Sequence, residues 1–122
     1  MIGLGIDAVD IDRFRATVAR RPTMVQRLFT MGERSYASGL ADPVPSLAVR
    51  FAAKEAVMKA LGVGVGAFAW QDVEIVRSDS GRPSLRVTGA AAALATRQGV
   101  GAWHVSLTHT AALAEAVVAA LP

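Results

Sequence analysis

Hydrophobic and polar residues alternate strictly in the first seven residues, MIGLGID. Ile2, Leu4 and Ile6 fall on one side of an extended chain, whereas two glycines and Asp7 fall on the other. This period of two is typical of a half-buried β-strand. We therefore predict a strand with one aliphatic face and one face of bare backbone that ends in a carboxylate.

Helix signals follow this strand. Asp10 is a suitable N-cap for a helix with an apolar i, i+3, i+7 face, and Thr30 and Glu33 have the spacing of a capping box. The prolines of ADPVPS favour irregular structure, which makes Ser46 the predicted cap of a longer helix. The first predicted helix follows Asp10. The others run from Thr23 to Phe29, from Thr30 to Gly39, from Ser46 to Gly62, and from about Gly89 to Gln98.

Strand patterns dominate the second half of the chain. The turn SDSG separates DVEIV from PSLRV, which predicts a hairpin, and WHVSLTH and LAEAVVAAL predict two more strands. Several helices and a mostly antiparallel sheet of about five strands make an α+β fold. At this length we expect a single domain over residues 1–122.

Composition excludes two classes of protein. With 52% hydrophobic and 19% charged residues the chain is too apolar for disorder, and no apolar run approaches the roughly 20 residues that cross a bilayer. Acids directly follow the first apolar stretch, unlike in a secretory signal, and the absence of cysteine excludes disulfides and thiolate metal sites. We expect a soluble, cytoplasmic protein with no membrane association.

Positive charge is concentrated near the N-terminus. The net charge is +3, but residues 13–34 alone carry six arginines against one acid, Glu33, a balance of +5. Such a patch can attract nucleic acid, a phosphate-bearing ligand or an acidic protein. A genome of strongly biased composition also favours arginine, so both origins of the patch stay open at this point.

The segment RFAAKEAVMKALG contains both lysines of the chain, Lys54 and Lys59. On a helix, Glu55 and Lys59 share one side as an i, i+4 ion pair, which is worth about 0.2 to 0.5 kcal/mol when exposed. Arg50 and Lys54 instead fall on the apolar side. Long basic side chains can extend past the edge of a core, but two neighbouring cations there favour an anion that binds from that edge.

Other polar residues are weaker candidates for a site. Asp7, beside glycines that let a ligand approach, could share Mg²⁺ with Glu55, because this ion takes one or two carboxylates and leaves its other positions to water and phosphates. The same two acids are also compatible with a turn and an ordinary ion pair. His109 ends a polar row at a strand end, and Arg82 lies in a hairpin turn that would offer it to a phosphate.

Three blocks read together resemble a known family. GLGIDAVDIDR at residues 3–13, RFAAKEAVMKALG at residues 50–62 and VSLTHTAALAEAVV at residues 105–118 have the order and spacing of the holo-acyl-carrier-protein synthases, the short 4'-phosphopantetheinyl transferases. The middle block is the most specific. The resemblance implies the 4'-phosphopantetheinyl transferase fold. It also implies transfer of the phosphopantetheine arm of coenzyme A to a serine of apo-acyl carrier protein in fatty acid biosynthesis, with release of adenosine 3',5'-bisphosphate.

The resemblance also implies roles for individual residues. Asp7 and Glu55 would bind Mg²⁺, and Glu55 is a candidate base for the serine. Lys59 would meet the phosphate under attack or the leaving group, so that Glu55 and Lys59 are the predicted catalytic residues. The predicted coenzyme A contacts are Arg50, Lys59, Gly62, Gly81, Arg82, Pro83, Thr108 and His109.

The family further implies partners. Members of the short class are typically homotrimers with sites between subunits, and Arg13 and Arg20 match positions that dock the acidic carrier protein. Thr23 and Met24 depart from the basic residue and phenylalanine that relatives often carry there. The alternative is a basic binding module without catalysis. With 6% aromatic residues and no nucleic-acid motif, we do not expect nucleic acid as a partner.

Overall fold

The computed structural model describes all of residues 1–122. All predicted helices and strands are present, with boundaries moved by a few residues, and one short 3₁₀ helix was not predicted. The elements are β1 (Gly3–Asp10), α1 (Ile11–Arg20), α2 (Thr23–Leu28), α3 (Met31–Ser38), α4 (Val44–Ala60), η1 (Trp70–Asp72), β2 (Val73–Arg77), β3 (Pro83–Val87), α5 (Gly89–Arg97), β4 (Ala102–His109) and β5 (Leu113–Leu121).

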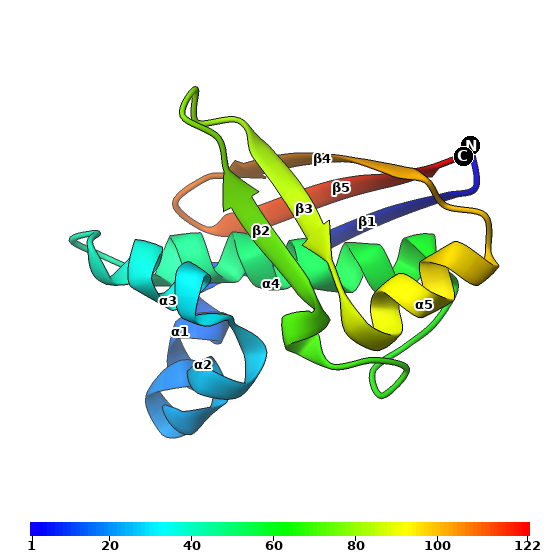
Figure 1. The fold of residues 1–122 in the computed structure, drawn as a ribbon. Coiled ribbons are helices and arrows are strands. Elements are labelled where there is room, and N and C mark those ends of the chain that lie inside the picture. Colours follow the sequence, from blue (N-terminus) through cyan, green and yellow to red (C-terminus); the bar gives the residue numbers. More distant parts are fainter.

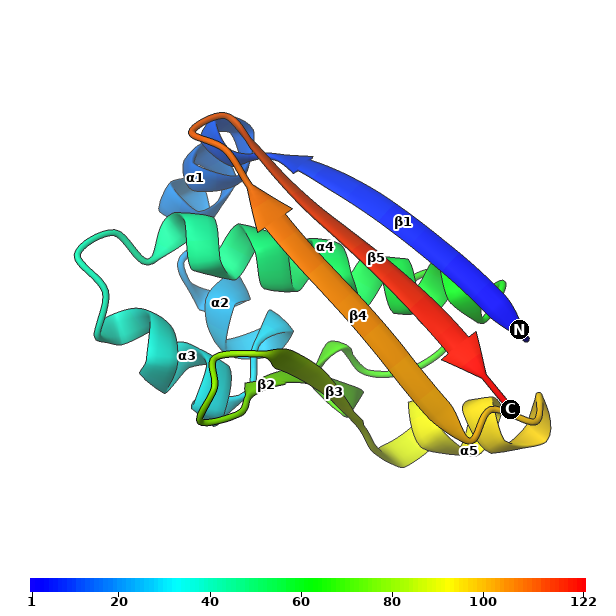
Figure 2. The same cartoon turned by 90° about the horizontal axis from the view of Figure 1, so that it is seen from above.

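The strands pair only in antiparallel fashion, and they form two sheets. β1, β5 and β4 form a three-stranded sheet in that order, whereas β2 pairs with β3 alone. α4 packs against β1 and β5, and the β2–β3 hairpin crosses α4 on another side (Figure 1, Figure 2). The α+β class is confirmed. The single sheet that we predicted is two sheets in the structure, because β3 lies beside β4 but forms no hydrogen-bond ladder with it.

The bare face of β1 packs on α4. A Cβ atom added at Gly5 would lie 1.9 Å from the carbonyl oxygen of Ala56, and Gly3 is equally crowded by the next turn of the helix. Only glycine lets the strand and the helix approach this closely. Leu4 and Ile6 lie on the opposite face and are each 60% exposed. Strand alternation alone would place these aliphatic side chains inward.

α4 belongs to both hydrophobic clusters of the protein. The larger cluster joins the second half of α4 to β2, α5 and β5, and the smaller one joins its first half to α1, α2 and α3. The ring of Phe51 on α4 lies 5.4 Å from that of Phe14 and 5.1 Å from that of Trp70. The helix is therefore fixed on several sides, and it presents Arg50, Glu55 and Lys59 from a rigid base.

Lys54 and Glu33 form a fully buried ion pair. Lys54 Nζ lies 2.8 Å from Glu33 Oε1, and neither side chain is accessible to solvent. The ammonium also donates to backbone carbonyls of η1 and β2, while Glu33 accepts from the amide of Thr30 and from one amide of β2. Burial lowers the pKa of Lys54, and the charge of Glu33 opposes that shift. The expectation that Lys54 reaches an external anion is therefore wrong.

The helix termini follow the predicted caps with one exception. Asp10 accepts from the amide of Arg13 at the start of α1, and Thr30 forms the capping box of α3. α4 begins at Val44 instead of after Ser46. Prolines are tolerated in its first turn, where the missing N–H has no intrahelical partner in any case. The protein has no helix with the length and hydropathy of a membrane span.

Candidate active site

Asp7 and Glu55 line one hollow beside α1. β1 carries Asp7 on the face that packs on α4, and α4 presents Glu55 toward the same space. The hollow has a volume of about 360 Å³, and we call it the carboxylate hollow. Its walls are formed by Asp7, Ala8, Val9, Asp10, Arg13, Phe14, Thr17, Met24, Phe51 and Glu55.

Lys59 pairs with Asp7 and forms no ion pair or hydrogen bond with Glu55. Its Nζ donates to Asp7 Oδ1 and to the carbonyl oxygen of Ile6, each at 2.9 Å. The exposed Glu55–Lys59 ion pair considered from the sequence is absent. The close approach of α4 to β1 explains the difference, because it brings the Asp7 carboxylate within reach of the lysine.

Glu55 has no hydrogen-bond or ion-pair partner in the chain, although its side chain is half-buried. Burial raises the pKa of Glu55, the negative charge of Asp7 raises it further, and Lys59 partly opposes both. Two carboxylates that share a hollow in this way favour a cation between them.

The donor set fits a hard divalent cation. Zinc sites usually need three or four protein ligands, whereas Mg²⁺ takes one or two carboxylates and fills its remaining positions with water and substrate phosphates. Asp7 and Glu55 supply two carboxylates, and the walls of the hollow add no histidine or cysteine. These residues therefore suit Mg²⁺ better than a transition metal.

Arg50 lines a second hollow, of about 370 Å³, which we call the arginine hollow. The residue is only 2% exposed, its guanidinium donates to Ser46 Oγ at 2.6 Å, and its Nε has no partner. Its Cζ lies 4.6 Å from the centre of the Tyr36 ring. Burial lowers the pKa of Arg50, with Glu33 opposing and Arg77 adding to the shift. A buried guanidinium with an unpartnered N–H is suited to an anion.

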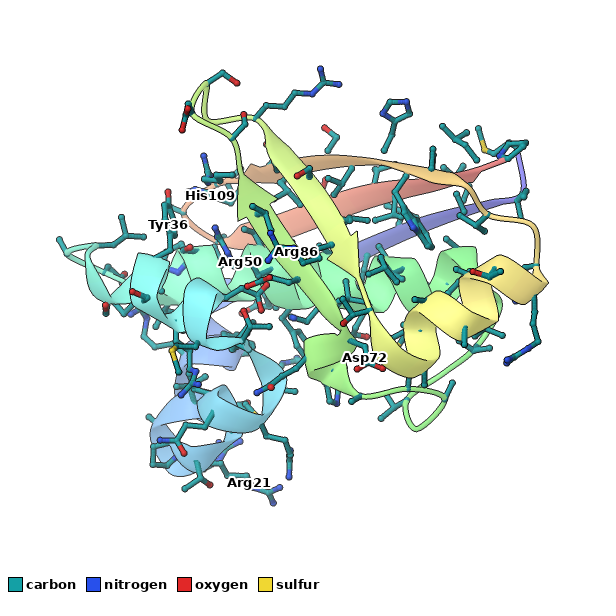
Figure 3. The ribbon with its side chains drawn as sticks, in the orientation of Figure 1. Arg21, Tyr36, Arg50, Asp72, Arg86 and His109 are labelled. Atoms are coloured by element: carbon teal, nitrogen blue, oxygen red, sulfur yellow. The ribbon has the colours of Figure 1, made fainter.

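His109 and Arg77 line the same hollow as Arg50. Figure 3 shows Tyr36, Arg50 and His109 gathered where α3, α4 and the end of β4 meet. Arg77 Cζ lies 5.3 Å from the centre of the Tyr36 ring, and its guanidinium donates to the carbonyl of Gly81. Tyr36 and Arg77 were not predicted from the sequence, where a helical tyrosine and a strand-end arginine carry no motif.

The other predicted coenzyme A contacts do not line either hollow, although Gly81 accepts from Arg77 of the arginine hollow and Thr108 precedes His109. Gly81, Arg82 and Pro83 form the end of the β2–β3 hairpin, with Gly81 at a φ of 85°. Thr108 is exposed on the outer face of β4, and Gly62 follows α4 at a φ of 70°. One chain therefore distributes the predicted contacts over separate surfaces.

The predicted docking residues lie on α1. Arg13 forms part of the carboxylate hollow, and Arg20 is exposed in the last turn of the helix. Arg15, between them in the sequence, forms an ion pair with Asp42 at 2.7 Å, so that its charge already has a partner within the chain. The basic surface thus begins at the wall of the carboxylate hollow.

The chain is similar to known proteins over nearly its whole length. Residues 3–120 match the 4'-phosphopantetheinyl transferase superfamily. A holo-[acyl-carrier-protein] synthase of Streptomyces avermitilis is 53% identical over 120 residues, which cover 98% of this chain and 97% of that protein.

Solved structures agree with these sequence matches. The holo-[acyl-carrier-protein] synthase of Neisseria meningitidis has a TM-score of 0.91 at 28% identity and covers 100% of this chain and 99% of its own. That of Helicobacter pylori, in complex with coenzyme A, has a TM-score of 0.85 at 29% identity, with 97% and 99% covered. The chain therefore belongs to the holo-[acyl-carrier-protein] synthases, a family of transferase enzymes within the 4'-phosphopantetheinyl transferase superfamily.

Proposed function

We propose that this enzyme transfers the 4'-phosphopantetheine arm of coenzyme A to a serine hydroxyl of apo-acyl carrier protein. The reaction depends on Mg²⁺ and releases adenosine 3',5'-bisphosphate. The observation that carries the proposal is the meeting of Asp7 and Glu55, from a strand and a distant helix, in one hollow beside Lys59. The names of the relatives support the reaction, and the Helicobacter pylori structure is a complex with coenzyme A.

The residues of the carboxylate hollow match the needs of such a transfer, which are mainly positioning and charge neutralisation at the pyrophosphate. Asp7 and Glu55 would hold Mg²⁺, which when bound neutralises and orients the pyrophosphate. Glu55 lacks a protein partner and is placed to accept the serine proton, directly or through water. Lys59 donates to the phosphate or to the leaving oxygen.

The arginine hollow is our proposed site for the nucleotide end of coenzyme A. Arg50 and His109 come together there, and the unpartnered Nε of Arg50 supports an anionic ligand. The hairpin residues, Thr108 and Gly62 complete the proposed set. Their separation within one chain supports a site to which a second chain contributes.

We therefore propose a homotrimer with sites between subunits. The outer face of the three-stranded sheet exposes Leu4, Ile6 and Val117, with exposed fractions of 60%, 60% and 38%. Contiguous exposed aliphatic side chains mark an interaction surface more often than a surface that stays in contact with water. Thr108 lies in the same sheet, on β4, so that contacts at this face would bring predicted substrate residues near a neighbour.

The carrier protein is proposed to dock on α1. Arg13 and Arg20 lie on this helix, and the basic segment around them is suited to an acidic surface. Because Arg13 also lines the carboxylate hollow, a carrier bound here would have its serine near Glu55. We propose carriers of fatty acid biosynthesis as the substrates, to be separated from polyketide carriers by assay of a carrier panel.

Mass spectrometry tests the proposed activity. The protein, incubated with coenzyme A, Mg²⁺ and an apo-carrier, should increase the carrier mass by one phosphopantetheine arm, and removal of Mg²⁺ by a chelator should prevent the increase. Glu55→Gln should lower kcat by about 100-fold or more, since a positioned acid–base group contributes 10²–10⁴-fold. Arg97→Gln, on the exposed end of α5, is the matched control. Full activity of Glu55→Gln with unchanged Mg²⁺ dependence would reject the assignment.

A further inference from the structure

The Lys59–Asp7 contact places a protein cation on a proposed metal ligand. Lys59 Nζ lies 2.9 Å from Asp7 Oδ1, so that the ammonium occupies one of the two carboxylate oxygens that Asp7 could offer to a divalent cation. The carbonyl oxygen of Ile6 also accepts from the ammonium, so that Lys59 lies beside Asp7, one wall of the carboxylate hollow. A divalent cation at this oxygen would meet a like charge at contact distance.

The two partners differ in their freedom to move. The Asp7 side chain is 12% exposed and is carried by the strand that packs tightly on α4. The Lys59 side chain is 54% exposed and has the flexible stem of a lysine. If the contact opens, Lys59 moves and Asp7 stays in place.

We infer that Lys59 is a built-in counter-ion for Asp7, which weakens metal binding to the empty enzyme and is released when a phosphate anion enters the hollow. The inference rests on the proposed function, because it takes Asp7 and Glu55 as metal ligands and a pyrophosphate as the entering anion. With the anion present, Lys59 gains a new partner and the Asp7 oxygen becomes free.

The consequence is that cation and pyrophosphate bind cooperatively. Each makes the other's binding more favourable, and by linkage the coupling has the same size in both directions. In a hollow with two carboxylates and no competing ammonium, the cation and the anion would be coupled only by their direct contact. Lys59 thus favours binding of the metal together with its substrate.

Binding of Mn²⁺, which paramagnetic resonance detects as the free ion, tests this inference without turnover. Lys59→Met should bind Mn²⁺ about tenfold more tightly than the wild-type protein when coenzyme A is absent, since 1.4 kcal/mol of lost repulsion is a factor of ten. Coenzyme A should increase Mn²⁺ affinity by a larger factor in the wild type than in Lys59→Met, where only the direct contact between the ion and the pyrophosphate remains. Arg97→Met removes one positive charge far from the hollow and should behave like the wild type.

Two further measurements separate the causes. In an Asp7→Asn background, Lys59→Met should no longer tighten Mn²⁺ binding, because the ion pair with the carboxylate is already gone, and circular dichroism should show all variants folded. Equal or weaker Mn²⁺ binding by Lys59→Met would overturn the inference. If the wild type still modifies the carrier in the same preparation, the proposed function stands. If no variant binds Mn²⁺ even with coenzyme A, both the inference and the metal assignment fail.

Discussion

The charged residues of α4 have different partners, although they follow one another closely in the sequence. Lys54 forms an internal ion pair, Lys59 holds Asp7, and Glu55 is left without a partner. Helical spacing correctly separated two charged stripes. It did not reveal which partner each side chain meets, because Glu33 and Asp7 come from elements far away in the sequence.

The Lys54–Glu33 pair gives a prediction at this scale. Lys54→Met should destabilise the protein by about 3 to 5 kcal/mol, because it leaves the Glu33 carboxylate buried without its cation. The double variant Lys54→Met, Glu33→Gln should lose less than the single variant, since no buried charge is left unpaired. Urea unfolding followed by circular dichroism measures both free energies. A single variant as stable as the wild type would show that the pair is not buried in solution.

A second residue-scale prediction concerns acid stability. Hydrogen bonding to Arg15 and to the amide of Val44 lowers the pKa of Asp42 below its ordinary value. A lowered folded-state pKa stabilises the protein above the unfolded value of 3.8, and this contribution is lost as the pH falls through the folded-state pKa.

The variant Arg15→Met should therefore be slightly less stable than the wild type at neutral pH and equally stable below the folded-state pKa of Asp42. Thermal melts from pH 7 down to pH 2 measure this convergence, with Arg97→Met as the charge-matched control. A stability difference that stays constant over the whole pH range would show that Arg15 acts through packing alone.

Among the elements, β1 and α4 show why close packing requires particular residues. Gly5→Ala should destabilise the protein by about 1 to 3 kcal/mol or more, as expected for overpacking a filled interior, because the new methyl group meets the backbone of α4. Gly64→Ala, where an added Cβ has no atom within 4 Å and φ is not positive, is the control and should be nearly neutral. Equal effects of the two substitutions would contradict the packing described for β1.

The same pair of elements shows the limit of prediction from sequence. The alternation in MIGLGID correctly predicted a strand, and the capping residues of α1 and α3 correctly predicted two helix starts. A period of two does not show which face of the strand is inward, however. The glycine face is buried here because only a strand without side chains lets α4 approach this closely. Arg77 and Tyr36 were missed for a similar reason, since only the tertiary fold brings them to Arg50.

For the whole molecule, α4 contributes to the walls of both hollows, and neither hollow contains all the predicted contacts. The carboxylate hollow holds Asp7, Glu55 and Arg13, and the arginine hollow holds Arg50 and His109. The family matches over nearly the full length support the reaction without assigning these residues. The order of blocks along the chain was sufficient to indicate the family, while the division between two hollows required the structure.

The outward face of β1 has a consequence for how the enzyme behaves on dilution. β1 carries Asp7 toward α4 and Leu4 and Ile6 toward solvent, so that one strand serves both the proposed metal site and the proposed contact between copies. Specific activity should therefore fall as the protein is diluted, and Ile6→Glu should produce a folded monomer with little activity, as measured by light scattering beside the carrier assay. A fully active monomer would show that each chain holds a complete site. If the prediction holds, the cell's concentration of this small enzyme sets the fraction of its chains that can work.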